Sequence, residues 1–112
     1  MAANDRRAKI LAEAWIGDAV LSLYVRQRIL REKGKLDSAE LERFTSNQAL
    51  TVFGEPSEVE ADIGRVYAAE GLQAAFARIE AKLMPVFRKQ EQKRLKAAGS
   101  SRKPAVPARP VN

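Results

Sequence analysis

The strongest constraint in this chain is an apolar stretch at residues 10–30, whose periodicity is that of a helix rather than a strand. Placing successive residues 100° apart groups its apolar side chains into two stripes on opposite sides of one helix. The first stripe contains Leu11, Ala14, Leu21, Val25 and Ile29, and the second contains Ile16, Val20, Leu23 and Leu30. A helix that is apolar on two sides is enclosed by protein on both. We expect one side to face the core and the other a partner subunit.

An acidic residue, Asp18, falls on the first of these stripes. An ionised carboxylate on a buried stripe costs several kcal/mol of folding free energy unless a cation or hydrogen-bond donors meet it. Proteins tolerate that cost mainly at functional sites. One interpretation is therefore that Asp18 is a functional ligand. The alternative is a structural acid bonded to a helix terminus or to an arginine such as Arg43.

Capping residues and apolar periodicity predict only helices in the rest of the chain, so we expect an all-α fold of four to five helices. A single helical domain is expected over residues 1–98. The predicted helices cover residues 5–33 up to Gly34, residues 37–54 with Asp37 as N-cap, residues 56–71 with Ser57 and Glu60 as a capping box, and residues from 72 onward with a kink or new start at Pro85.

Positive charge is concentrated near the C-terminus. From Lys82 onward the chain has nine basic residues and one acid, a net charge of +8, whereas residues 1–81 carry −2. A basic segment beside an acidic body is typical of contact with nucleic acid phosphates, although a solvated, solubilising tail has the same composition. The prolines of residues 99–112 predict a disordered tail. The candidate RNA-binding residues before it are Arg88, Lys89, Lys93, Arg94 and Lys96.

The chain contains no cysteine and no histidine. This composition excludes thiolate and imidazole metal sites and any nucleophile that depends on histidine, and it leaves carboxylates as the ligands for a hard cation such as Mg²⁺. No stretch approaches the length of an uncharged membrane span. We therefore expect a cytoplasmic protein with no membrane association.

Two segments resemble motifs of the ribonuclease III family. Residues 11–26, LAEAWIGDAVLSLYVR, are similar to the family's signature helix, whose core reads aromatic, aliphatic, Gly, Asp, Ala or Ser, aliphatic. Residues 60–72, EADIGRVYAAEGL, are similar to its second acidic motif. Between them, residues 41–50 look like the helix in which the family has an Arg followed by Asn-x-x-Leu. The resemblance covers about residues 10–80.

The resemblance implies an all-helical endonuclease that forms a homodimer and cuts double-stranded RNA with Mg²⁺, or alternatively Mn²⁺, held by carboxylates. Of the family's acids only Asp18 and Glu60 are retained, because Leu11, Ala14 and Ser57 stand at the other three positions. Asp18 and Glu60 are therefore the predicted catalytic and metal-binding residues. The chain is closest to the compact Mini-III branch, which lacks a double-stranded-RNA-binding domain, but the stretch between its motifs is shorter.

Three further residues each fit more than one role. Glu60 has the spacing of a capping-box acid with Ser57, which would make it purely structural. Glu58, otherwise a helix-start charge, could substitute for the acid lost at Ser57. Trp15 is expected at the dimer contact rather than as a platform for bases, because it lies within the apolar helix.

The main functional prediction is an Mg²⁺-dependent endoribonuclease that processes double-stranded or structured RNA. A catalytically degenerate domain of the same fold, acting in RNA binding or on the ribosome, is the alternative. A helical protein-interaction module without a nucleic-acid role is the third interpretation.

Overall fold

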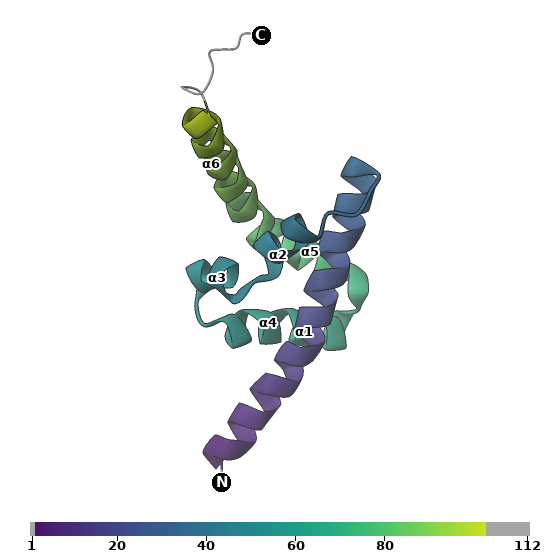
Figure 1. Ribbon diagram of the computed structural model, residues 1–112. Coiled ribbons are helices and arrows are strands. Elements are labelled where there is room, and N and C mark those ends of the chain that lie inside the picture. The colour runs from purple at the N-terminus through teal and green to yellow at the C-terminus, as the bar shows by residue number, and fades with distance from the viewer. Residues whose placement is uncertain (1, 103–112) are drawn as a thin grey trace.

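In the computed structural model, the described part of the chain, residues 2–102, consists of helices joined by short turns (Figure 1). Side chains are described for residues 4–98. No strand occurs in residues 2–102, which confirms the expected all-α class. In chain order the elements are α1 (Ala2–Lys33), α2 (Ser38–Thr45), α3 (Asn47–Leu50), the 3₁₀ turn η1 (Thr51–Phe53), α4 (Pro56–Glu70), α5 (Leu72–Lys82) and α6 (Met84–Arg102).

Helix α1 is the longest element, and α4 crosses it near its middle (Figure 1). At the crossing the two backbones touch through Gly17 and Gly64. A Cβ atom placed on Gly17 would overlap the carbonyl oxygen of Glu60, and one placed on Gly64 would overlap that of Glu13. The close approach is therefore available only to glycine at both positions.

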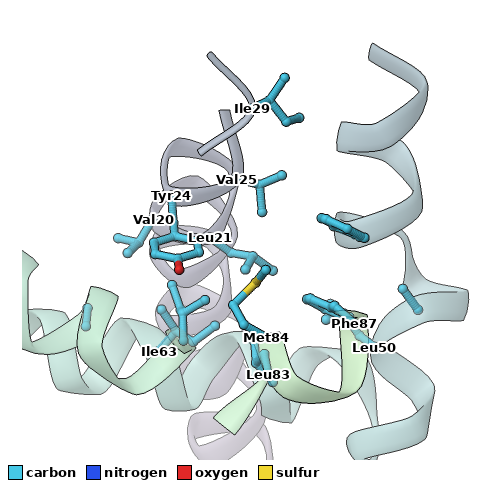
Figure 2. Close-up of a cluster of buried hydrophobic side chains, with 14 residues drawn as sticks. Val20, Leu21, Tyr24, Val25, Ile29, Leu50, Ile63, Leu83, Met84 and Phe87 are labelled. Carbon is cyan, nitrogen blue, oxygen red and sulfur yellow. The ribbon is translucent and has the colours of Figure 1, made fainter. Parts of the chain in front are cut away.

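The hydrophobic core lies on one side of this crossing and is shared by almost every element (Figure 2). Leu21 and Val25 of α1 are fully buried and belong to the same cluster as Ile63 of α4. The start of α6 contributes Phe87, whose ring stacks on Phe44 with 5.3 Å between ring centroids. The first turns of α6 are thus part of the core, whereas its later turns leave the body (Figure 1).

Ion pairs join the helices around this core. Glu13 of α1 pairs with Arg65 of α4 at 2.8 Å, and Asp62 of α4 pairs with Arg78 of α5 through two of the guanidinium nitrogens. Tyr24 of α1 donates a hydrogen bond to Glu80 of α5. Exposed pairs of this kind contribute at most about 1 kcal/mol each, so the apolar cluster carries most of the stability.

Glycines end two helices as predicted. Gly34 follows α1 with φ of 72°, and Gly71 follows α4 with φ of 95°, both in the region that side chains disfavour. The predicted N-cap is also confirmed, because Asp37 accepts a hydrogen bond from the backbone N–H of Glu40 at 3.0 Å.

The predicted single helix over residues 37–54 is wrong. Ser46 adopts an extended conformation, and its hydroxyl oxygen accepts from the N–H of Ala49, which ends α2 and starts α3. A serine that caps the following turn competes with helix continuation, and apolar periodicity does not reveal that competition. With the new start at Pro85, which is confirmed, residues 2–102 contain six α-helices rather than four or five.

Helix α6 continues to Arg102, past the predicted domain end at residue 98. The rest of the predicted tail, residues 103–112, lies outside the described residues. Over the helices that are described, none combines the length and hydropathy needed to cross a membrane.

One side of α1 is covered by the chain and the other is not. Ala14, Leu21, Val25 and Ile29 of the first stripe are buried, whereas Leu11, its member nearest the N-terminus, is exposed. Of the second stripe only Val20 is buried, while Ile16, Leu23 and Leu30 are exposed. The two-sided character of α1 therefore leaves an apolar stripe that no residue of the described part, 2–102, covers.

The glycine crossing predicts a large steric effect from a single methyl group. Gly64→Ala should lower the free energy of unfolding by about 3 kcal/mol, because α1 and α4 must separate to admit the Cβ. Helix propensity alone would favour alanine at this position by about 1 kcal/mol. Urea denaturation followed by circular dichroism measures the change.

Ala68→Gly, at an exposed position on the same helix, is the matched control. It should cost only the propensity difference of about 1 kcal/mol. A Gly64→Ala variant as stable as the wild type would contradict the backbone contact.

Candidate active site at the α1–α4 crossing

The crossing brings together two acidic residues that lie far apart in the sequence. Gly17 packs against the backbone of Glu60, and Asp18 follows Gly17 directly. Asp18 and Glu60 line the same hollow, and Asp18 is near enough to act on the Glu60 carboxyl through its charge and a side-chain hydrogen bond. The two predicted catalytic residues, one from each acidic motif, therefore form a pair.

The carboxyl pair opens onto a hollow of about 570 Å³. One wall is α1, which contributes apolar side chains and Asp18. The opposite wall comes from the turn between α2 and α3 and from the first turns of α4. The lining residues are Leu11, Ala12, Ala14, Trp15, Asp18, Thr45, Asn47, Ser57 and Glu60, and no lysine or arginine is among these described residues.

The surroundings of Glu60 disfavour the ionised form of its carboxyl group. Burial, the hydrogen bond and charge of Asp18, and the charge of Glu55 together raise its pKa to about 7, with burial the largest cause. The Glu60 carboxyl is therefore partly protonated at neutral pH. A bound cation would relieve the same repulsion.

The expectation that Asp18 lies on a buried stripe is wrong for the chain itself. Its side chain is exposed, because α4 crosses α1 on the flank that carries Gly17 and leaves Asp18 at the edge of the contact. The structural alternative of a pair with Arg43 is also wrong. Arg43 donates to both carboxylate oxygens of Glu91 on α6, at 3.1 and 2.9 Å.

Glu60 is not a capping residue either. Helix α4 begins at Pro56, and its N-cap is Glu55, whose carboxylate accepts from the N–H of Glu58 at 3.2 Å. Ser57 is already inside the helix and lines the hollow instead. The predicted capping box is therefore wrong, and the Glu60 carboxyl is left facing Asp18.

The donors in the hollow fit a hard divalent cation. Two carboxylates supply negative charge, and Asn47 and Ser57, whose side chains carry an amide oxygen and a hydroxyl, line the same hollow. These oxygen donors suit Mg²⁺, which keeps several waters when it binds. Within the described residues no group of three acidic side chains is close enough to hold a metal ion. A cation here would therefore have two protein carboxylates and would be held weakly.

Two other predicted residues take separate positions. Glu58 lines a different pocket, with Asp62 and Arg78, on the α5 side of α4. Trp15 is 79% exposed and lies on the rim of the hollow, so it is free to contact a partner.

The predicted RNA-binding residues divide into two sets. Arg88 and Arg94 form ion pairs, with Glu80 at 2.6 Å and with Glu91 at 2.9 Å respectively. The other three, Lys89, Lys93 and Lys96, are exposed and follow the spacing i, i+4, i+7, which places them on one face of α6. We call this face the lysine stripe.

Sequence reasoning missed the two glycines that build the site. Gly17 precedes Asp18, and Gly64 lies one turn after Glu60. A glycine inside a helix costs about 1 kcal/mol relative to alanine, so its presence indicates a packing requirement. The occurrence of two such glycines, each near an acidic residue, was the sequence signal that could have revealed the helix contact. Nothing in the spacing indicated that Asn47 would line the same hollow.

The raised pKa of Glu60 predicts a pH-dependent stability. Its pKa is higher in the folded state than the ordinary value of 4.5, so the folded state binds the extra proton between about pH 4.5 and 7. Stability should fall as the pH rises through that window and then level off. Because the site is open to solvent, we expect a change on the order of 1–2 kcal/mol.

Thermal unfolding of the wild type and Glu60→Gln without divalent ions measures this effect. The two proteins should differ little below pH 4.5, and the variant should be the more stable above pH 7. Parallel pH profiles would contradict the carboxyl contact.

Comparison with known proteins found no matching family model, no similar curated protein and no similar solved structure. The functional assignment therefore depends on the residues of the hollow and on the charges around it.

Proposed function

We propose that this protein is an Mg²⁺-dependent endoribonuclease that cuts double-stranded or structured RNA, with a ribonuclease III-like domain acting as a homodimer in the cytoplasm. The observation that carries the proposal is the contact between Asp18 and Glu60. These are the two acids that the resemblance to the family assigns to the metal, and they meet at an open hollow with no cationic lining residue.

The chemistry follows from the donors in the hollow. Asp18 and Glu60 would hold the cation through their carboxylate oxygens, and Asn47 and Ser57 would orient water or a phosphate oxygen beside it. A Mg²⁺ ion supplies polarisation of the phosphodiester and acidification of the attacking water. The hollow is open, so a duplex backbone can approach the pair without entering a closed cavity.

RNA as the substrate is supported by the lysine stripe. Lys89, Lys93 and Lys96 take part in none of the ion pairs among the described residues, and their side chains are exposed on α6, whose later turns leave the body (Figure 1). Lysines arranged along one helix face can neutralise successive phosphates and release their counterions. Arg88 and Arg94 are less available to bind phosphates because they form ion pairs with Glu80 and Glu91.

A homodimer is supported by the uncovered stripe of α1. Ile16, Leu23 and Leu30 are exposed, and Tyr67 of α4 extends the same apolar surface. An isologous contact between two copies of α1 would bury this surface in both subunits at once. Trp15 lies at the border between this stripe and the hollow.

A second candidate is supported by the small number of ligands. Within the described residues only two carboxylates meet in the hollow, because Leu11, Ala14 and Ser57 lack the acids of the family pattern. A domain that has lost catalysis and binds RNA through the lysine stripe would have the same features. Cleavage of duplex RNA with Mg²⁺ distinguishes the two functions.

The first test of this function is a cleavage assay on long duplex RNA with and without Mg²⁺. The wild type should cut only with the ion. Asp18→Asn and Glu60→Gln should lower the rate at least about 100-fold, because each removes half of the charged ligand set. Glu58→Gln, an equivalent change on the other side of α4, should leave the rate unchanged.

Thermal unfolding of the same variants separates metal binding from fold loss. Mg²⁺ should raise the melting temperature of the wild type and have little effect on Asp18→Asn, because only a native state with the ligand gains binding energy. Without metal, Asp18→Asn should be as stable as the wild type or more so, since it relieves the repulsion with Glu60. A destabilised Asp18→Asn and a wild type that ignores Mg²⁺ would reject the nuclease function.

The dimer predicts a concentration-dependent mass. Sedimentation at micromolar concentrations should give twice the chain mass for the wild type. Leu23→Lys should produce a monomer, because it places a charge at the centre of the contact. Leu95→Lys, a change at an exposed leucine of α6, is the control and should remain dimeric. A monomeric wild type would exclude the dimer.

A further inference from the structure

Helix α1 extends past the α4 crossing as an exposed arm at its N-terminal end (Figure 1). Every side chain from Asn4 to Lys9 is exposed. The arm carries three basic residues, Arg6, Arg7 and Lys9, against one acid, Asp5. Among the ion pairs of the described residues none includes these three bases, so the fold does not need them.

Helical geometry places one of these bases on the face of the candidate site. Arg7 precedes Asp18 by 11 residues, which is three turns of helix with a remainder of only about 20°. Leu11, one turn after Arg7 on the same face, lines the hollow. With a rise of 1.5 Å per residue, Arg7 lies about 16 Å along the axis from Asp18. Lys9 lies about 180° away, on the opposite face.

Arg7 supplies positive charge, which the lining of the hollow lacks. The hollow contains two carboxylates and no lining cation, so by itself it repels a phosphate backbone. A substrate must therefore be held by positive charges outside it. Arg7 is the first basic residue on this face of α1 before Asp18, and its guanidinium can engage phosphate oxygens in a bidentate manner.

We infer that Arg7 is a positioning residue that contacts the RNA backbone about 16 Å from the carboxyl pair, measured along α1 toward the N-terminus. This inference rests on the proposed function. The lysine stripe is on α6, which leaves the body away from the N-terminal end of α1 (Figure 1). The two basic regions therefore contact different parts of the RNA, and Arg7 fixes its register along the site.

The experiment compares Arg7→Gln with Lys9→Gln in the full chain. Each variant removes one positive charge from the same exposed arm, so net charge and fold are matched. The affinity for a long duplex RNA is measured in EDTA over a series of salt concentrations. Arg7→Gln should weaken binding several-fold and reduce the slope of log affinity against log salt by about 1, whereas Lys9→Gln should match the wild type.

The kinetics of cleavage with Mg²⁺ supply a second measurement, because a purely structural role of Arg7 would not separate the effect on KM from the effect on kcat. Arg7→Gln should raise KM and leave kcat unchanged, because the guanidinium is too far from the carboxyl pair to touch the reacting atoms. A triple change of Lys89, Lys93 and Lys96 to Gln is the positive control for backbone binding.

The possible failures are distinguishable. A wild type that binds duplex RNA, with Arg7→Gln and Lys9→Gln equal in affinity and salt slope, would overturn the role of Arg7 and leave the proposed function intact. A wild type that neither binds nor cuts duplex RNA would overturn the proposed function and this inference together.

Discussion

The backbone contact between α1 and α4 is the interaction on which the rest of the structure depends. Because Gly17 and Gly64 have no Cβ atoms, the two helices approach until side-chain packing is replaced by main-chain contact. That approach sets the position of Ile63 in the core and brings Glu60 against Asp18. Stability and the candidate site therefore share one origin, and a separation of the helices would affect both.

Two groups of charges in this protein have different physical roles. Charges that join helices are paired, as in Glu13 with Arg65 and Arg43 with Glu91. The second group consists of the Asp18–Glu60 pair, which repels itself, and the exposed bases near the two ends of the described residues. The first group stabilises the fold weakly. In the second group the carboxyl pair opposes folding, and the exposed bases contribute nothing to the stability of the fold. Both properties are typical of residues that serve binding or chemistry.

Much of the local structure was predictable from the sequence because it depends on local chemistry. Gly34, Gly71 and the Asp37 cap act within one turn of chain, and each was found in the predicted place. The break at Ser46 was missed since a cap and a helical serine look alike in the sequence. The exposure of Asp18 was missed for another reason. Periodicity gives the faces of a helix but not which flank a crossing helix will cover.

The site and the uncovered stripe of α1 are physically linked through Trp15. This side chain is 79% exposed, lines the hollow and borders the apolar surface of Ile16 and Leu23. A second copy packed on that surface would also cover one rim of the hollow and remove water from it. Lower local dielectric strengthens the attraction between a cation and the two carboxylates, so a ligand set of two becomes more effective in the dimer than in the monomer. In the proposed dimer, assembly would then compensate for the acids of the resembled family pattern that are absent at Leu11, Ala14 and Ser57.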